Sequence, residues 1–290
     1  EFSPDQTLPI IPFSDGAGEV VKVGAGVSRV AVGDLVTPLF FPCWISGEAL
    51  GDERSTSRGL EVPGVLREYG VFDEDAVARA ASHLSAEEAA CYPCAGLTAW
   101  TSLVPVSGIG PGDYVLLQGT GGVSIMALQF AKALGAQVMI TSSSDEKLER
   151  ARQLGADLCV NYKSSPEWGE AALEWTGGRG VDAVIEIGGT GTLPKSIQAI
   201  RRGGHIPVIG YLAGAAIELT VFDLIIKNAN LHGIGVGNRD NYETMMQFVA
   251  KHQLRPVIHK SYSFENAGQA LSDLPMGQHL GKLTVKIAVS

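Results

Sequence analysis

The second half of the chain alternates between short apolar runs and stretches with the periodicity of amphipathic helices. The apolar runs show no regular polar alternation, which is typical of strands in a parallel sheet covered on both faces. We predict helices at about 122–134, 145–154, 166–176 and 191–202. The predicted strands are 114–118, 137–141, 157–160, 181–187, 204–209 and 231–235. This alternation predicts an α/β fold with a doubly wound parallel sheet.

The turn after the first of these strands is rich in glycine. The strand Tyr-Val-Leu-Leu-Gln leads into Gly119, Gly121 and Gly122, and a helix follows Val123. Such glycines let the backbone approach the pyrophosphate of a dinucleotide, and the first amides of the helix carry partial positive charge towards it. A strict fingerprint has a third glycine where this chain has Ser124, so the motif depends on its βαβ context. We predict a Rossmann nucleotide site at this turn.

Glycines also follow the last three predicted strands. Ligands of open parallel sheets lie beyond the carboxyl ends of the strands, so three such turns favour a backbone-lined trough for the cofactor. Each turn taken alone is equally consistent with ordinary turn chemistry. The predicted contacts are Ile187, Gly188, Gly210, Tyr211, Leu212, Gly235, Val236 and Gly237.

The end of the second strand bears on the choice of cofactor. NAD enzymes usually place a carboxylate there to bind the ribose hydroxyls, whereas this chain has Thr-Ser-Ser-Ser at 141–144. Ser142 and Ser143 would not repel a 2′-phosphate, and Lys147 lies one helical turn further on. We therefore expect NADP(H) to be preferred, with NAD(H) possible. An alternative is that Ser143 and Glu146 form a capping box and that Lys147 is a surface charge.

Composition excludes several classes of protein. The net charge of −9 argues against a nucleic-acid surface, and no apolar stretch reaches the length of a membrane span. Four cysteines in 290 residues do not make a disulfide framework, so a reduced, cytoplasmic location is expected. These features fit an enzyme that acts on a small-molecule substrate.

The first part of the chain has a different pattern. Residues 19–24 and 33–38 are short β runs divided by glycines, which predicts an antiparallel module. The chain ends in another β run at 282–287, which we expect to return to that module. The predicted domains are therefore 1–103 with 253–290, and a nucleotide domain at 104–252.

Several motifs carry a family resemblance. Residues 14–36 resemble the signature of medium-chain dehydrogenase/reductases, and residues 93–100, 208–211, 233–239 and 281–285 match further motifs in order. The chain is most similar to the zinc-type alcohol dehydrogenase-like and quinone oxidoreductase branches. This resemblance implies a Rossmann sheet inserted in a GroES-like antiparallel β domain and a homodimer formed through the edge of the nucleotide sheet. It also implies that strands preceding residue 2 in relatives are missing, so the first domain is expected to be N-terminally truncated.

The chain departs from the zinc-dependent members. Where they carry Gly-His-Glu, it has Phe-Ser-Asp at 13–15, so Ser14 replaces a histidine ligand. Cys94 falls where some members place a cysteine ligand, but a zinc site needs about four ligands. The pair Cys91 and Cys94 has no second pair, which favours packing over metal or redox chemistry. No zinc is predicted.

Without zinc, an electrophilic acceptor is the favoured substrate, because a quinone or enone accepts hydride with hydrogen-bond help alone. The prediction is a zinc-independent NADP(H)-dependent oxidoreductase acting on a quinone, enone or carbonyl. Alternatives are an alcohol dehydrogenase or carbonyl reductase using NAD(P), a cofactor-binding protein without turnover, and a reductase module acting on enoyl thioesters.

The matched motifs also suggest individual site residues. Ser14, Asp15 and Thr98 are the catalytic candidates by position, and Thr98 also falls beside the cofactor. Ser14 and Asp15 have the alternative of bonding backbone amides at the turn before Gly16, and Thr98 that of bonding its own helical turn. The resemblance further places Tyr162, Lys282 and Arg239 near the cofactor, with ordinary surface cations as the alternative for Lys282 and Arg239.

Overall fold

The computed structural model describes residues 8–216 and 219–287. The chain divides into two compact units, Glu1–Leu97 with Val236–Ser290, and Thr98–Gly235. The first crossing lies in helix α2 (Leu97–Thr101) and the second follows strand β9 (Asn230–Gly233). We expected the crossings at 103/104 and 252/253, so the difference is mainly helix α8 (Arg239–His252), which belongs to the first unit.

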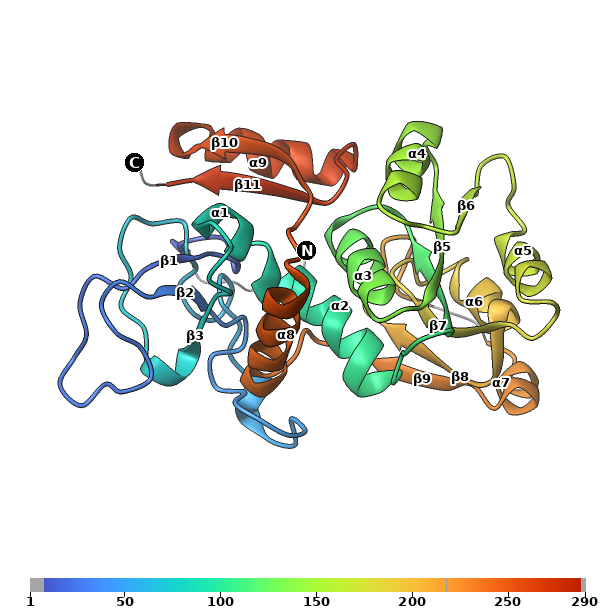
Figure 1. The fold of residues 1–290 in the computed structure, drawn as a ribbon, viewed down its shortest axis with the longest axis horizontal. Helices are drawn as coiled ribbons and strands as arrows, with labels where there is room; N and C mark the ends of the chain where they lie inside the picture. Colours follow the sequence, from blue (N-terminus) through green and yellow to red (C-terminus); the bar gives the residue numbers. More distant parts are fainter. Residues whose placement is uncertain (1–7, 217–218, 288–290) are drawn as a thin grey trace. The chain divides into compact units, whose positions relative to one another are not determined.

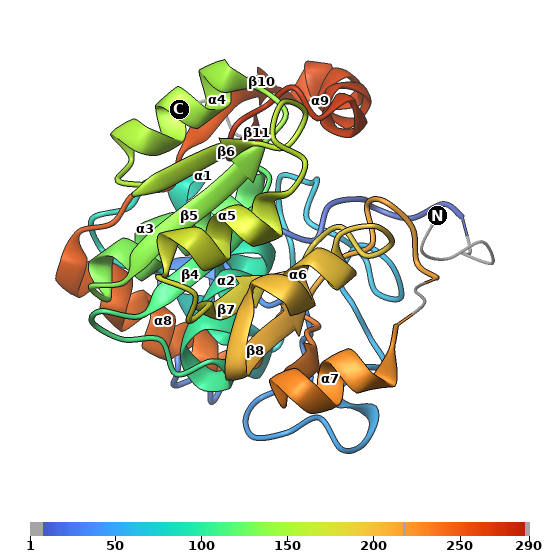
Figure 2. The same ribbon diagram turned by 90° about the vertical axis from the view of Figure 1, so that its right-hand side faces the viewer.

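The second unit contains a six-stranded parallel sheet with the order β6-β5-β4-β7-β8-β9. Figure 2 shows the strands from β6 to β8 in this order. The chain starts in the middle of the sheet, runs to one edge and returns to the middle, which is the order of dinucleotide-binding folds. The switch point lies between β4 and β7. Leu116 of β4 lies opposite Met139 of β5 and Val184 of β7, and all three are fully buried. The remaining strands are β4 (Tyr114–Gln118), β5 (Gln137–Ser142), β6 (Leu158–Asn161), β7 (Val181–Ile185) and β8 (Ile200–Val208).

Helices cover both faces of this sheet, with α3 on one face and α5 and α6 on the other (Figure 1). The predicted strands and helices are confirmed within a few residues. Helix α7 was not predicted, because its sequence Val-Phe-Asp-Leu-Ile-Ile-Lys is short and apolar on nearly every side. No helix in the described part of the chain is long and apolar enough to cross a membrane. The helices of this unit are η4 (Ser102–Val106), α3 (Gly122–Ala133), α4 (Asp145–Gln153), α5 (Trp168–Trp175), α6 (Leu193–Ala199) and α7 (Val221–Lys227).

The first unit contains two small sheets. Strands β1 (Gly18–Glu19), β2 (Leu35–Pro38) and β3 (Val77–Arg79) form the predicted antiparallel sheet, while β10 (Ile258–Ser263) and β11 (Lys282–Lys286) form a separate parallel pair. The C-terminal β run therefore belongs to this unit, but it pairs with β10. The helices are η1 (Asp52–Arg54), η2 (Glu74–Ala76), α1 (Ala86–Ala89), η3 (Tyr92–Gly96), η5 (Phe264–Asn266), α9 (Ala267–Asp273) and η6 (Leu274–Met276).

Helix α8 joins the first unit through an apolar stripe. Tyr242, Met245, Met246 and Val249 are buried at helical spacing. The hydroxyl of Thr37 on β2 donates a hydrogen bond to the hydroxyl of Tyr242 over 2.7 Å. This burial explains why α8 falls in the first compact unit.

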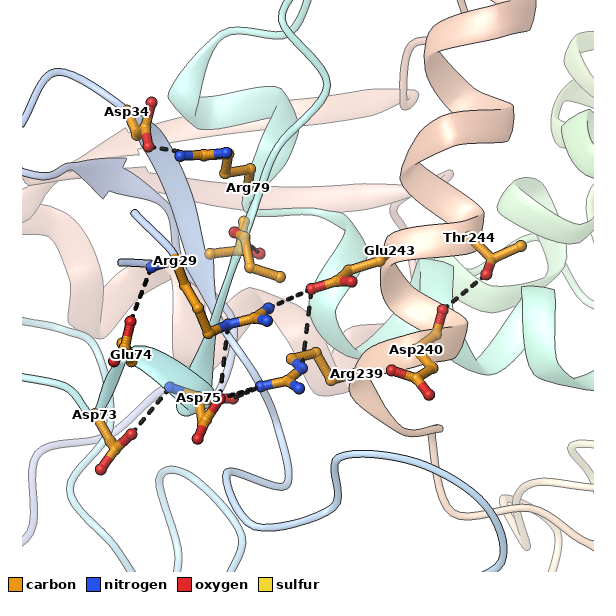
Figure 3. Close-up of polar contacts among 12 residues, drawn as sticks. Arg29, Asp34, Asp73, Glu74, Asp75, Arg79, Arg239, Asp240, Glu243 and Thr244 are labelled. Atoms are coloured by element: carbon orange, nitrogen blue, oxygen red, sulfur yellow. Dashed lines mark hydrogen bonds and ion pairs between the residues drawn. The ribbon is translucent and has the colours of Figure 1, made fainter. Parts of the chain in front are cut away.

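An ion-pair cluster holds the amino end of α8 (Figure 3). Arg239 pairs with Asp75 at 2.5 Å, and Arg29 pairs with Glu243 at 2.5 Å. Arg29 also lies 3.6 Å from Asp75, so the four side chains form one network. Arg239 is 9% exposed, so it is not a surface cation. Its guanidinium is already paired with Asp75 and is not left over for a cofactor phosphate.

Candidate active site

The glycine-rich turn has the geometry that an anion requires. Gly119 follows β4 with a φ of +69°, a left-handed conformation that favours glycine. No described side chain caps the amino end of α3, whose N-cap is Gly121, so its first amides remain available to a phosphate. Ser124 replaces the third glycine of the fingerprint, and its buried hydroxyl donates to the carbonyl of Gln118 over 2.6 Å. That bond holds the helix against the strand.

A buried carboxylate lies at the carboxyl end of β7, and sequence reasoning missed it. Glu186 is fully buried and accepts hydrogen bonds from neutral donors on both oxygens. Its Oε1 accepts from the amides of Gly188 and Gly189 at 2.9 and 3.0 Å. The remaining donors are Thr192 Oγ1 to Oε1, and Gln118 Nε2 and Ser196 Oγ to Oε2. The signal available in the sequence was an acidic residue at the end of a mostly apolar strand, directly before the Gly-Gly turn.

Gln118 completes the connection across the switch point. Its amide nitrogen donates to Glu186 over 2.6 Å, and its amide oxygen accepts from the backbone amides of Ile187 and Gly188 at 3.2 and 3.3 Å. The ends of β4 and β7 and the turn after β7 are therefore fixed to one another. This is the part of an open parallel sheet where ligands bind.

The turns after β7 and β8 pack closely. A Cβ on Gly188 would lie 2.4 Å from the hydroxyl of Thr192, and one on Gly210 would lie 2.9 Å from the carbonyl of Ile187. The amide of Leu212 donates to that same carbonyl over 3.1 Å. The structure thus brings these two predicted turns together, whereas Gly235–Gly237 form the crossing into the first unit, with Val236 at a φ of +57°.

The helix that follows β5 begins one residue later than the predicted capping box requires. The N-cap of α4 is Ser144, whose hydroxyl accepts from the amide of Lys147 at 3.4 Å, so the capping box assigned to Ser143 and Glu146 is wrong by one residue. Burial lowers the pKa of the Lys147 ammonium. The backbone of Tyr162 donates to the carbonyl of Ser142 over 3.1 Å, which places the half-exposed Tyr162 ring at the same sheet edge.

In the first unit, three polar side chains form a chain of contacts. The hydroxyl of Ser14 donates to Oδ1 of Asp15 over 2.8 Å, and the ammonium of Lys282 donates to Oδ2 over 3.3 Å. Burial lowers the pKa of Lys282, but the Asp15 carboxylate and two nearby thiols outweigh it, so the pKa is raised above its ordinary value. The alternative in which Ser14 and Asp15 bond backbone amides is not the arrangement found among the described residues. Lys282 is likewise engaged by a carboxylate of its own unit.

A neighbouring loop fixes the position of Ser14. The preceding residue, Phe13, has a φ of +69°, which is uncommon for a residue other than glycine. The carbonyl of Phe13 accepts from the amide of Val65 at 2.9 Å, and the amide of Gly64 donates to Ile11 at 2.7 Å. A Cβ on Gly64 would lie 2.2 Å from the carbonyl of Pro12, so only glycine allows this approach. Thr98, the third catalytic candidate, lies in α2 and is 3% exposed.

Comparison with known proteins agrees with these observations. The family model for an alcohol dehydrogenase GroES-like domain matches residues 2–86, and the model for a zinc-binding dehydrogenase matches residues 122–251. A zinc-type alcohol dehydrogenase-like protein of Schizosaccharomyces pombe is 40% identical over 97% of this chain and 83% of its own length. The chain belongs to the medium-chain dehydrogenase/reductase superfamily. Both the resemblance and the predicted fold class are confirmed.

Other medium-chain dehydrogenase/reductases are similar along the same span. An alcohol dehydrogenase of Geobacillus stearothermophilus is 34% identical over 97% of this chain and 84% of that protein. A solved structure from Sinorhizobium meliloti 1021, provisionally named an alcohol dehydrogenase, has a TM-score of 0.92 at 41% identity and covers 98% of this chain and 83% of that one. The protein is thus an oxidoreductase of the NAD(P)(H)-dependent type.

The residues around Ser14 do not fit the zinc ion that some medium-chain dehydrogenase/reductases contain. Ser14 offers a neutral hydroxyl that already donates to Asp15, and the ammonium of Lys282 holds the other oxygen of that carboxylate. An ammonium group at this position would repel a metal cation. In the described parts of the chain, no three His, Cys, Asp or Glu side chains gather to hold a metal. We derive no step of the reaction through zinc.

The Cys91 thiol of this medium-chain dehydrogenase/reductase is expected to be inert. Cys91 is fully buried, its thiol donates to the carbonyl of Glu87, and burial raises its pKa to about 12. At pH 8 only ~10⁻⁴ of it would be the reactive thiolate. Site-resolved labelling with iodoacetamide should therefore modify the exposed Cys43 and leave Cys91 unmodified until denaturant is added. Rapid labelling of Cys91 in the native protein would contradict its assignment to the core.

Glu186 is expected to position the nucleotide turn. In Glu186→Gln an NH₂ group would face hydrogen-bond donors, so the turn after β7 should shift and both NADPH and NADH should bind about tenfold more weakly. Asp182→Asn is a matched control, since Asp182 is a buried carboxylate near the other end of the same strand and pairs with Arg179 and Arg201. It should lower the free energy of unfolding by about 1–3 kcal/mol without changing affinity. Fluorescence titration and thermal denaturation of both variants provide the measurements, and unchanged affinity in Glu186→Gln would refute the assignment.

Proposed function

We propose that this protein is a zinc-independent, NADPH-dependent reductase that transfers hydride to an activated small acceptor such as a quinone, an enone or a carbonyl. The observation that carries the proposal is the contact chain Ser14–Asp15–Lys282, at 2.8 and 3.3 Å. It supplies a hydroxyl and a cation where zinc-dependent relatives have a metal ligand. Such groups stabilise a developing oxyanion without a metal.

Each group of this chain has a role in the proposed reaction. The bound nicotinamide would supply the hydride, which forms a new C–H bond on the acceptor while the displaced electron pair moves to oxygen. The Ser14 hydroxyl would turn from Asp15 to that oxygen and give it a proton. Lys282 would replace the proton through Asp15, since one carboxylate contacts both groups, and would regain a proton from water before the next turnover.

In the resting enzyme, Lys282 should remain protonated throughout an ordinary assay range. The folded-state pKa of Lys282 is raised, so its pairing contributes to stability below the ordinary lysine pKa of about 10.4, as long as the Asp15 carboxyl is ionised. On the alkaline side, that contribution disappears as the pH rises through the still higher folded-state value. No loss of activity between pH 6 and about pH 9 should therefore be due to deprotonation of Lys282.

The tip of β5 supports NADPH as the cofactor. Ser142 and Ser143 stand where NAD enzymes place a carboxylate, and Lys147 follows in the first turn of α4. Asp145, the acidic residue nearest to these serines in the sequence, accepts a hydrogen bond from the side chain of Asn161 over 2.7 Å. A 2′-phosphate would thus meet hydroxyls and a cation.

The test is steady-state oxidation of NADPH and NADH in the presence of a chelator, with a quinone, an enone, an aldehyde and an alcohol as substrates. Chelator-resistant reduction of the quinone or enone with NADPH is expected. Activity that is lost on chelation and restored by Zn²⁺ would overturn the proposal. Tight NADPH binding without oxidation by any acceptor would instead identify a cofactor-binding protein without turnover.

Two relatives favour other substrates of the same chemistry. Several similar proteins are named alcohol dehydrogenases, which makes oxidation of an alcohol the second candidate. A structure of a 2-octenoyl-CoA carboxylase reductase in complex with NADP and 2-octenoyl-CoA has a TM-score of 0.84 at 27% identity, over 95% of this chain and 68% of that one. An enoyl thioester therefore belongs in the substrate panel.

A homodimer through the edge of the nucleotide sheet is part of the proposal. β9 is the edge strand, and the neighbouring helix α7 presents Phe222 and Ile225 at 63% and 69% exposure. Large exposed apolar side chains of this kind mark association surfaces. Ile225→Glu should convert the dimer to a monomer in sedimentation, whereas Leu50→Glu, at an exposed site in the first unit, should leave it intact. A monomeric wild-type protein would contradict this expectation.

A further inference from the structure

The second unit contains a pocket at the amino ends of the strands, on the side of the sheet away from the nucleotide turns. Its volume is about 560 Å³, and its lining is Gly178, Arg179, Arg201, Arg202, Ile226 and Lys227. Arg179 precedes β7, Arg201 and Arg202 belong to the start of β8, and Lys227 ends α7, which packs beside β8 (Figure 2). These are the amino ends of strands, whereas the nucleotide turns follow the carboxyl ends. A strand of five residues separates its amino end from its carboxyl end by about 16 Å.

The pocket is strongly cationic on an acidic protein. Four of its six lining residues carry a positive charge, while the chain as a whole has a net charge of −9. Two carboxylates act on this cluster. Asp182 accepts from Arg179 at 2.6 and 2.8 Å and from Arg201 at 2.5 Å, and Asp113 acts on Arg179 from further away. Four cations against two carboxylates leave an excess of two positive charges.

The excess charge is concentrated on Arg202 and Lys227. Among the residues that the structure describes, the ammonium of Lys227 donates only to the backbone carbonyls of Gln198 and Ile200, both at 2.8 Å. Burial and the charge of Arg202 lower the pKa of the Lys227 ammonium. Within the described ranges, no carboxylate pairs with the guanidinium of Arg202. Two neighbouring cations thus share a pocket without a counter-ion of their own.

From this geometry we infer that the pocket is a binding site for a phosphate-bearing small molecule, separate from the nucleotide site. Like charges held close together are costly unless an anion offsets them. A phosphate group with two negative charges would match the excess charge, and guanidinium groups bind its oxygens in bidentate fashion. The site would act whether or not the reductase proposal is right, since none of its residues belongs to the candidate active site.

Calorimetric titration with inorganic pyrophosphate and with inorganic phosphate, at constant ionic strength set with potassium chloride, tests this site. Saturable binding is expected, and Arg202→Gln should weaken it about tenfold, the effect of losing one charge-assisted hydrogen bond. Because no described side chain pairs with Arg202, this variant should keep the wild-type melting temperature.

Two control variants separate this site from others. Arg150→Gln removes an exposed arginine of α4 and should leave the affinity unchanged. Lys147→Gln alters the predicted 2′-phosphate contact and should also leave it unchanged. Absence of saturable binding, equal affinity in Arg202→Gln and wild type, or loss of binding in Lys147→Gln would each overturn the inference.

Discussion

Replacing Ser14 with alanine is expected to lower kcat for the favoured acceptor by about 100- to 1,000-fold. The substitution removes the hydroxyl that we propose to donate to the acceptor oxygen, and loss of one such donor has an effect of this size. The dissociation constant for NADPH should stay the same, because the predicted nucleotide contacts of the glycine-rich turn lie in the second unit. Stopped-flow measurement of NADPH oxidation, combined with fluorescence titration, separates the two effects.

Ser272→Ala is the matched control for this prediction. Ser272 lies in α9 of the same unit, and its hydroxyl donates only to the carbonyl of Gly268 among its described partners. Its loss should leave kcat unchanged. If Ser14→Ala retained wild-type kcat while remaining folded, Ser14 would not be the donor, and Thr98 would be the next hydroxyl to replace.

Replacing Lys147 with glutamine is expected to weaken NADPH binding about 10- to 100-fold and to leave NADH binding unchanged. The ammonium is the charged partner that we propose for the 2′-phosphate, and a charged hydrogen bond contributes about 1.5–3 kcal/mol. The preference for NADPH over NADH should therefore fall by the same factor. Fluorescence titration with both nucleotides measures it directly.

Arg150→Gln serves as the control on the same helix. Arg150 is exposed one turn beyond Lys147, where it is expected to contribute only to the overall electrostatic potential around the nucleotide. An equal loss of NADPH affinity in both variants would mean that net charge, rather than a specific contact, sets the preference. Equal binding of NADPH and NADH by the wild-type protein would refute the phosphate contact altogether.

Regular patterns in the sequence were sufficient to predict the parallel sheet. The strands of the second unit are apolar runs with no competing periodicity, and the turn at Gly119 needs a residue that tolerates positive φ. Helix α8 was not predicted, because its apolar stripe is divided by polar residues and its place depends on distant partners such as Thr37 and Asp75. Local patterns do not record contacts across two hundred residues.

The candidate site was predicted less completely, for a similar reason. Ser14 and Asp15 were found by their place in a motif, but their bond to each other and the pairing with Lys282 join the two ends of the chain. Glu186 was missed because the apolar run around it predicts a buried strand but does not show which groups would bond its carboxylate. Its burial depends on donors from three separate segments, which become neighbours only in the fold.

The discontinuous first unit has a consequence for how the protein is made. Its antiparallel sheet comes early in the chain, whereas α8, β10 and β11 come last. The second unit is a single continuous segment, so it can complete its core while the ribosome is still adding residues. The amino-terminal segment of the first unit cannot complete its core before α8 emerges, so its apolar side chains stay exposed until then. Chaperone dependence during synthesis should therefore be concentrated in the first unit, and a nascent chain that has emerged from the ribosome as far as Gly235 should have a folded centre and a protease-sensitive amino-terminal segment.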